Sequence, residues 1–449
     1  MLRVTKLSSF SLILLAISAQ ATEFYVDSEN GSDSNPGSQS APWKSISKVN
    51  STSFTAGDRV RFKRGGTWAE TLRPSSSGLS QNHIVYEEYG TGPLPRITGS
   101  TDGDCIAWFS SRSFLTFRNL HLQDCGQPNG KNKGGINVWN EGAPSRDILI
   151  EGSVIERAHY WNIYMTGVDG LIIRNNVIRN AELQHGIYLD GTLGLHNATI
   201  EANEIYGNKD MCVQFNSNGV ERLTKITLRY NKLHDCGKGG VNNIGVNGLL
   251  AHHNLIYGDM PGIYNGCDGA DSGCSAGATG GRYYNNTIAT SGSAWATCFE
   301  NSSSSGSPDF KEFKNNICVH NATNGPVFSH EETSGSAISD YNVFFSGPGA
   351  STQIVWNNQW YASFAEHKAG TGQDSNSLSG DPSLVDPVNF DFRLSQQSPA
   401  MDTGINLGFS RDIAGNPVPS GAGPERGAFE QPLSQEPSLP TPIGLRLIK

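Results

Sequence analysis

One short sequence phrase recurs nine times between Leu115 and Phe344, and it limits the possible folds more than any other feature. Each copy opens with a small polar residue, usually followed by an apolar pair, as in Asn176-Val177-Ile178, and continues through a polar turn into a second strand-like run. The copies begin at Asn119, Ser153, Asn176, Asn203, Asn231, Asn254, Asn286, Asn316 and Asn342, with spacings of 23 to 34 residues. A repeat of this length without a helical period indicates a solenoid of β-coils.

The recurring Asn predicts how the coils are held together. An Asn that points inward at the same turn of every coil can hydrogen-bond to the coils above and below it, and such ladders stabilise stacked β-structure. We therefore expect the Asn side chains to lie inside the solenoid.

The first 21 residues are predicted to be a secretory signal peptide. Arg3 and Lys6 precede a short apolar run, and Ala19-Gln20-Ala21 has the small-x-small pattern of a cleavage site. No later stretch has about 18 continuous apolar residues, so we expect an exported protein without a membrane span.

Removal of Arg3 and Lys6 changes the formal charge from −9 to −11. That balance argues against a nucleic-acid partner and mildly disfavours a polyanionic substrate, unless a groove is locally basic.

The cysteine content suggests disulfides. Eight Cys lie in the mature chain, at positions 105, 125, 212, 236, 267, 274, 298 and 318, and an even number in an exported protein favours pairing. We expect sequence neighbours to pair, because Cys212 and Cys236, and likewise Cys298 and Cys318, lie about one coil apart. Cys267 and Cys274 would close a small loop.

Both ends of the chain resemble a known superfamily. The opening, FYVDSENGSDSNPGSQSAPWKSISKVN, then GDRVRFKRGGTW and YGTGPLPRITG, resembles secreted right-handed parallel β-helix proteins of the pectate-lyase-like superfamily. The segments Asp391-Phe392-Arg393-Leu394 and Ser398-Pro399-Ala400-Met401-Asp402 resemble the end of such proteins. The resemblance implies an all-β, right-handed parallel β-helix, but this superfamily hosts lyases, hydrolases, epimerases and binding proteins on one scaffold.

The resemblance and the repeat together give a domain organisation. We expect the signal peptide at 1–21 and a β-helix domain at 22–430, followed by a Pro-rich linker or tail at 431–449. Within the domain, residues 22–100 form a cap and the first coils, 115–345 form the regular coils, and 346–430 form a closing segment, because a solenoid must cover its apolar ends.

The second strand of each coil predicts an outward face that suits sugars. The residue after Gly, Asn or Cys is apolar and points inward, so the next residue points outward. A first outward column then holds Asn137, Tyr164, Tyr188, Gln214, Asn242 and Tyr264, and a second outward column holds Trp139, Thr166, Asp190 and Asn216. Neutral polar groups beside aromatic rings match the hydroxyl edges and apolar faces of sugars. Trp139, Tyr164, Asp210, Gln214, Asn216, Asn242 and Tyr264 are our candidate substrate-binding residues.

The chemistry-bearing residues cluster on three successive coils. They are His185, Tyr188, Asp190, Lys209 and Lys238. A lyase that acts on a uronate needs a base, a group that stabilises enolate-like charge, and an acid for the leaving oxygen. Lys209 or Lys238 could serve as base or charge neutraliser, and Tyr188 or His185 as acid or base.

The leading interpretation is a secreted enzyme that cleaves a uronate-containing polysaccharide by β-elimination and acts as a monomer. One alternative is a glycoside hydrolase that uses paired carboxylates such as Asp190 and Asp210. An epimerase and a non-catalytic glycan-binding surface protein also remain open.

Asp268 and Asp271 form a candidate Ca²⁺ site, because Ca²⁺ prefers oxygen ligands. The pectin-hydrolase motifs and the pectate-lyase arginines are not recognisable, which argues against a pectin-specific activity. His252-His253 should face opposite sides of a strand, one buried and one exposed.

Overall fold

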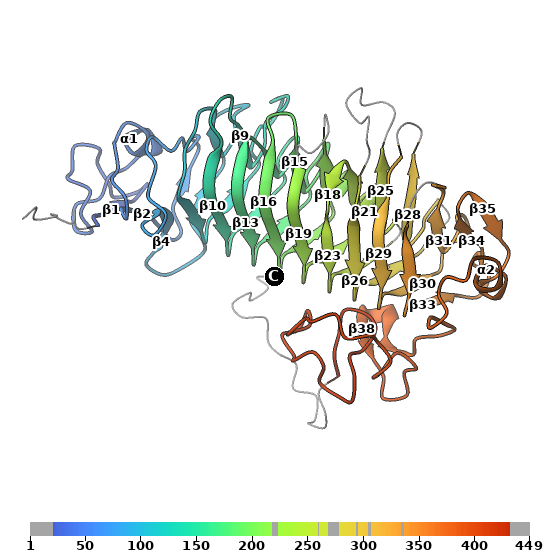
Figure 1. Cartoon of the computed structure of the whole chain (residues 1–449). Helices are drawn as coiled ribbons and strands as arrows, with labels where there is room; N and C mark the ends of the chain where they lie inside the picture. Colours follow the sequence, from blue (N-terminus) through green and yellow to red (C-terminus); the bar gives the residue numbers. More distant parts are fainter. Residues whose placement is uncertain are drawn as a thin grey trace, which may run out of the picture.

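The computed structural model describes residues 21–217, 223–258, 260–267, 278–292, 295–303, 307–333 and 336–431. They form a β-solenoid of three parallel sheets that run along the long axis of the molecule (Figure 1). The predicted all-β parallel β-helix is thereby confirmed. Residues 1–20 of the predicted signal peptide and 432–449 of the predicted tail lie outside the described residues.

Each coil adds one strand to each sheet in turn. The first sheet contains β1 (Glu23–Val26), β2 (Arg59–Lys63), β4 (Ile84–Tyr89), β7 (Leu115–Arg118), β10 (Ser145–Glu151), β13 (Val168–Arg174), β16 (Leu195–Glu201), β19 (Leu223–Arg229), β23 (Leu250–His252), β26 (Gly281–Tyr284), β29 (Phe310–Lys314) and β32 (Ile338–Asp340), with β22 (Val246–Asn247) beside β19. The second sheet contains β3 (Thr67–Trp68), β5 (Arg96–Ile97), β8 (His121–Gln123), β11 (Val154–Glu156), β14 (Val177–Arg179), β17 (Glu204–Tyr206), β20 (Lys232–His234), β24 (Leu255–Gly258), β27 (Thr287–Thr290), β30 (Ile317–His320), β33 (Val343–Ser346) and β36 (Leu378–Ser379).

The third sheet carries the outward face predicted from the sequence. It contains β6 (Ile106–Trp108), β9 (Ile136–Trp139), β12 (Ile163–Thr166), β15 (Ile187–Asp190), β18 (Met211–Asn216), β21 (Gly239–Ile244), β25 (Ile263–Cys267), β28 (Phe299–Ser303), β31 (Phe328–His330), β34 (Ile354–Trp356) and β35 (Gln359–Tyr361). All of its described pairings are parallel except the last, between β34 and β35. A separate hairpin pairs β37 (Leu384–Asp386) with β38 (Asp391–Leu394), around the short 3-10 helix η1 (Pro387–Asn389).

The core is a stack of apolar residues that occupy the same place in successive coils. In the first sheet, Ile148 of β10 lies beside Leu171 of β13, and Ile150 lies beside Ile173. All four are buried, whereas the residues between them are more exposed. This alternation gives each coil one inward face, so stacking adds apolar contacts at every step.

A ladder of buried Asn side chains links the coils at the turn before each second-sheet strand. Asn176 donates its backbone N–H and its side-chain amide to Oδ1 of Asn203, both at 3.0 Å. The same pattern continues through Asn231, Asn254, Asn286, Asn316 and Asn342. Each amide also donates to a backbone carbonyl of the preceding coil, as Asn203 does to Ile173 at 2.9 Å. The predicted inward ladder is therefore confirmed for these seven residues.

The prediction was wrong for the first member, Asn119. The ladder position in its coil belongs to Leu120, whose N–H donates to the Ser153 hydroxyl at 3.1 Å. Asn119 lies one residue earlier, in a turn with a left-handed backbone (φ 53°), and donates its side-chain amide to Glu88. Asn is common in such conformations, so the residue type fits either position.

Short helices lie at both ends of the solenoid (Figure 1). Helix α1 (Ile46–Asn50) buries Ile46 and Val49, and helix α2 (Phe364–Thr371) buries His367, which lies 3.0 Å from Asp374. These elements occupy the ends of the stack, where the apolar interior would otherwise meet water.

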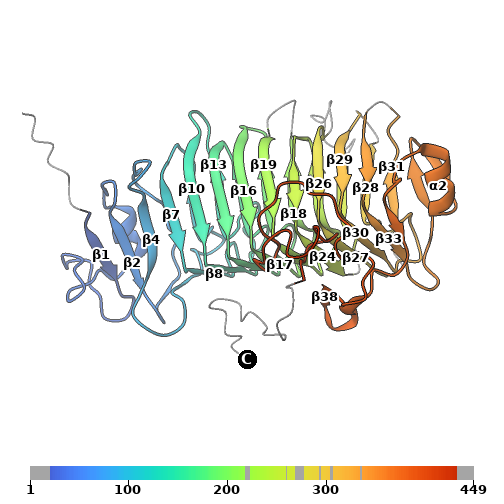
Figure 2. The ribbon, with the colours of Figure 1, turned by 60° about the horizontal axis from the view of Figure 1, so that its bottom comes forward.

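The chain after α2 folds back along the outside of the coils. Figure 2 shows this closing segment lying against the coils around β24 and β27. The side-chain amide of Asn315 donates to the carbonyl of Ile405 in this segment. The backbone N–H of Ala428, also in the segment, donates to the Thr287 hydroxyl. Asn315 is one of the left-handed turn residues, so these turns also dock the closing segment.

Two of the expected disulfides are present. Cys105 is bonded to Cys125 and Cys212 to Cys236. The expected bond between Cys298 and Cys318 is not formed, although the two side chains are in contact: both are buried thiols, and burial together with this contact raises the pKa of Cys318. Cys274 and the side chain of Cys267 lie outside the described residues.

Both His252 and His253 are buried, so the expectation that one is exposed was wrong. Their Nδ1 atoms lie 3.0 Å apart, and the ring of Phe409 from the closing segment stacks on His252 at 4.4 Å. The closing segment covers the side chain that would otherwise face water. Burial lowers the pKa of His253 to about 3.

Replacing a central ladder residue should destabilise the fold. In Asn231→Ala, the backbone N–H of Asn203 and the carbonyl of Ile200 lose their partner inside the core. We expect the free energy of unfolding to fall by roughly 2–4 kcal/mol, measured by denaturant titration. Asn82→Ala, at an exposed position, is the matched control. Equal midpoints for the two variants would contradict the structural role of the ladder.

Stability should also depend on the buried histidines at acid pH. As the pH falls from about 6.5 towards 3, the unfolded chain binds a proton that folded His253 cannot accept. The contribution of neutral His253 to stability is therefore lost as the pH decreases, by up to about 1.4 kcal/mol per pH unit. Denaturant titrations at several pH values should show a shallower slope in His253→Asn, since Asn tolerates the left-handed backbone of φ 51°. An unchanged slope would count against this contribution.

Candidate functional site

The two outward columns predicted for the third sheet are aligned by strand pairing. Tyr164 of β12 lies between Asn137 of β9 and Tyr188 of β15. The same column continues through Gln214, Asn242 and Tyr264. In the second column, Trp139 pairs with Thr166, and Asp190 pairs with Asn216.

A groove of about 540 Å³ opens over the N-terminal part of this face. Four of its lining residues were predicted as site residues: Trp139, Tyr164, Tyr188 and Asp190. The others are Phe109, Asn132, Lys133, Asn137, Tyr160, Trp161 and Gln184. The groove therefore combines aromatic rings and neutral amides with one carboxylate and one ammonium group.

The aromatic side of the groove is a packed set of rings. The rings of Trp161 and Tyr164 are stacked, with centroids 4.5 Å apart, and Trp139 is parallel to Tyr164 at 6.2 Å. Tyr188 meets Tyr164 edge-on at 5.2 Å. The buried indole N–H of Trp161 has no partner among the described residues. These rings provide an apolar surface with polar edges, which suits a sugar ring.

Asp190 lies at the floor of the groove and is buried. Its Oδ2 accepts the hydroxyl of Tyr164 at 3.0 Å, and its Oδ1 accepts the backbone N–H of Thr192 at 2.6 Å. Burial, together with the negative charge of Asp190, raises the pKa of Tyr164. Tyr164 therefore stays protonated and holds the carboxylate in place.

Tyr188 lies between the groove and a second group of polar residues. Its hydroxyl oxygen accepts the side-chain N–H of Asn216 at 3.1 Å, and its ring meets the ring of His185 edge-on at 5.1 Å. A donated N–H stabilises negative charge on the phenol oxygen. This contact gives Tyr188 a favourable environment for proton transfer.

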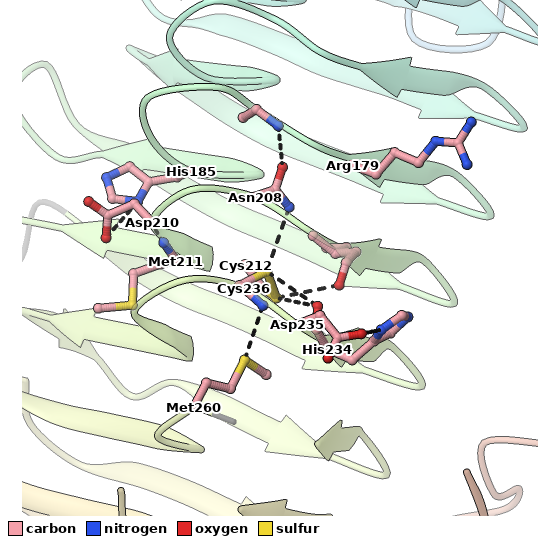
Figure 3. The surroundings of a disulfide bond; sticks show 12 residues. Arg179, His185, Asn208, Asp210, Met211, Cys212, His234, Asp235, Cys236 and Met260 are labelled. Carbon is pink, nitrogen blue, oxygen red and sulfur yellow. Dashed lines mark hydrogen bonds and ion pairs between the residues drawn. A yellow bond between two sulfur atoms is a disulfide. The ribbon is translucent and has the colours of Figure 1, made fainter. Parts of the chain in front are cut away.

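His185, Asp210 and Lys238 form what we call the His185 cluster, shown in part beside the Cys212–Cys236 disulfide in Figure 3. Nδ1 of His185 accepts the backbone N–H of Met211 at 3.3 Å and lies 3.8 Å from Asp210. Lys238 contacts the other oxygen of Asp210 at 2.8 Å. Burial lowers the pKa of His185 to about 4; Asp210 opposes this shift and Lys238 adds to it. His185 is therefore neutral at pH 7.

Lys209 does not join either group. Its side chain is exposed and does not line the groove, although its backbone N–H donates to the carbonyl of Ala181. Lys209 and Asp210 are adjacent in the turn before β18, and it is Asp210 that lies beside His185. The structure therefore does not bring Lys209 together with the residues that line the groove.

The remaining predicted residues extend the same face towards the C-terminal coils. Gln214 is 5% exposed, and neither its Oε1 nor Oδ1 of Asn242 has a partner among the described residues. Tyr264 donates its hydroxyl to the carbonyl of Ser302 at 3.0 Å. Both oxygens are buried, and neither Gln214 nor Asn242 lines the groove.

The calcium hypothesis concerns Asp268 and Asp271, which lie outside the part of the chain that the structure describes. Within that part, no His, Cys, Asp and Glu side chains form groups of three or more arranged to hold a metal ion. Likewise, none of its helices has the length and apolar character needed to cross a bilayer.

Several groove residues were missed because they lie outside the strands. Phe109 follows β6, Lys133 lies in the loop before β9, and Trp161 lies in the turn before β12. The alternation rule applies only within strands, so it cannot assign these side chains. The adjacent aromatic pair Tyr160-Trp161 in a polar turn is the one signal that could have indicated them.

Comparisons with known proteins agree with this architecture. Residues 104–288 match the family described as right handed beta helix region. The chain is 25% identical over 466 residues to the uncharacterized protein YwoF of Bacillus subtilis (strain 168), covering 83% of this chain and 91% of that protein.

Among solved structures, pectate lyase Pel9A is similar with a TM-score of 0.58 and 15% identity, covering 92% of this chain and 98% of that one. The structure of XylC with xylose has a TM-score of 0.56 and 13% identity, covering 92% and 99%. The chain therefore has the right-handed parallel β-helix fold that the resemblance implied, and its likeness to these two solved structures concerns the fold alone.

Proposed function

We propose that this protein is a polysaccharide-degrading enzyme that cleaves a uronate-containing chain by β-elimination in the groove. The observation that carries this proposal is the position of Tyr188. The side chain of Asn216 donates an N–H to the hydroxyl oxygen of Tyr188, and the ring of Tyr188 contacts His185. Two side chains that can transfer protons therefore lie beside the aromatic rings that line the groove. The similarity in fold to pectate lyase Pel9A supports the same class.

The elimination requires proton transfer at two places. A base removes the proton α to the carboxylate, the released electron pair forms the C4=C5 double bond, and the C4–O bond breaks as its oxygen takes up a proton. We assign proton transfer to Tyr188, assisted by neutral His185. Lys238, paired with Asp210, supplies positive charge near His185 that can offset the enolate-like charge.

Hydrolysis by paired carboxylates is the second candidate, because Asp190 lies in the groove. However, both oxygens of Asp190 already accept hydrogen bonds, and it is the only carboxylate among the described lining residues. Asp210 is paired with Lys238. A hydrolase needs one carboxylic acid and one carboxylate on either side of the bond, so the groove favours elimination.

Export and a monomeric state remain predictions. The two disulfides are consistent with an oxidising compartment. A signal peptide would be tested by the N-terminal sequence of the secreted protein, and the oligomeric state by sedimentation.

The products of cleavage distinguish the candidate functions. Incubation with alginate, pectate and glycosaminoglycans should yield oligosaccharides whose new double bond, conjugated with the carboxylate, absorbs in the ultraviolet. In the same assay, Tyr188→Phe should lower kcat by roughly 100- to 10,000-fold without changing the thermal midpoint. Tyr206→Phe, at a tyrosine of the second sheet, is the control. New reducing ends without the absorbance would indicate a hydrolase, and binding without any product would indicate a glycan-binding protein.

The role of His185 predicts an acid limit to activity. Since its pKa is about 4, kcat/KM on an active substrate should fall as the pH decreases through about 4, where His185 becomes protonated. His185→Gln should be less active and should lack this limb of the pH profile, while circular dichroism checks that it stays folded. A limb of the same midpoint in the variant would assign it to another group.

A further inference from the structure

Lys133 is the only cation among the described residues that line the groove. Its Nζ lies 3.2 Å from Oδ2 of Asp104 and 5.6 Å from the centre of the Phe109 ring. Its side chain is 35% exposed, whereas that of Asp104 is 2% exposed. An ammonium has three N–H donors, so this one can hold Asp104 on its buried side and still bind an anion on its open side.

The structure around Lys133 holds the ammonium in place. Oδ1 of Asp104 accepts the backbone N–H of Gly134 at 2.9 Å and the side-chain amide of Asn137 at 3.1 Å. These two donors neutralise part of the negative charge of Asp104, which leaves the positive charge of Lys133 facing the groove.

The loop that carries Lys133 is tied to the segment that carries Asp104. The Cys105–Cys125 disulfide joins their ends, and Gly126 donates its N–H to the carbonyl of Gly103 at 2.7 Å. The N–H of Asn129 donates to the side chain of Asp102 at 2.8 Å. A loop restrained in this way loses little further freedom when a ligand binds.

Lys133 is separated from Tyr188 along the solenoid axis. Its neighbour Asn137 is in β9, and Tyr188 is in β15, two strands further along the same column. Two strand spacings amount to about 10 Å. The platform of Trp161 and Tyr164 lies between them. When one sugar residue reacts at Tyr188, Lys133 is therefore in a position to contact a different sugar residue of the same polysaccharide.

We propose that Lys133 binds the carboxylate of an acidic sugar residue next to the one that reacts, and that Asp104 is the positioning residue for this subsite. The inference rests on the proposed function and adds a specificity determinant to it. Lys133 selects an acidic polysaccharide and contributes to binding, but it takes no part in proton transfer.

The test compares acidic and neutral ligands on the full-length mature protein. The probes are oligogalacturonates and oligomers of alginate of matched length, each with its carboxyl-reduced counterpart. Dissociation constants are measured by isothermal titration calorimetry, and kcat and KM on whichever polymer is cleaved.

For Lys133→Gln, we expect the Kd for the better acidic oligomer, and the KM on its polymer, to rise about tenfold or more, with little change in kcat. The Kd for the carboxyl-reduced oligomer should not change, and Lys133→Arg should restore most of the affinity. Asp104→Asn should weaken acidic ligands in the same selective way. Lys131→Gln, which removes the same charge from an exposed position in the same loop, is the matched control.

Three outcomes would overturn the proposal: an equal loss for acidic and reduced oligomers, an equal effect of Lys131→Gln, or no binding of any acidic oligomer by the unmodified protein. Failure of the proposed function is distinguishable from these. If the protein cleaves none of the polymers but still binds acidic oligomers through Lys133, the subsite stands and the elimination mechanism falls.

Discussion

The hydrogen bonds of the buried Asn ladder are the constraint on which the rest of the structure depends. Each ladder amide joins three coils, because it accepts from one neighbour and donates to the next and to a backbone carbonyl. A buried amide without these partners would be costly, so a coil cannot shift relative to its neighbours without breaking several contacts at once. The same restraint fixes the register of the third sheet, which carries the groove on its outer face.

Sequence periodicity was sufficient for the parts of the site that lie within strands. Because side chains alternate, the position of one inward residue assigned Tyr164, Tyr188 and Asp190 to the outer face, and strand pairing agrees. It was insufficient where a residue type fits two environments. Asn is suited to a left-handed turn as well as to a ladder position, and Asn119 occupies the turn. Spacing gives the coil to which a residue belongs but not its place within that coil.

The groove depends on contacts between segments that the repeat does not encode. Trp161 and Lys133 come from turns of different lengths, and their positions follow from ring stacking and from the Cys105–Cys125 bond. The local charge of the groove, like its shape, does not follow from the repeat or from the overall composition. The chain is acidic as a whole, with a net charge of −9, which taken alone disfavours an anionic ligand. A single ammonium held over a desolvated carboxylate changes the local balance, since short-range contacts in a partly buried groove exceed a screened net charge.

The division between the inner and outer sides of the coil explains how such a fold can carry different activities. The ladder and the apolar stack use inward residues, so the outward residues of the third sheet, such as Tyr188, are not required to form the core. His185 shows where this separation ends. It packs against Tyr188 and accepts a backbone N–H from the next coil, so it contributes to both fold and site. Its burial keeps the ring neutral at pH 7, and a neutral imidazole can accept a proton during turnover. The catalytic assignment therefore rests on the packing of the coils as much as on the residues that face the groove.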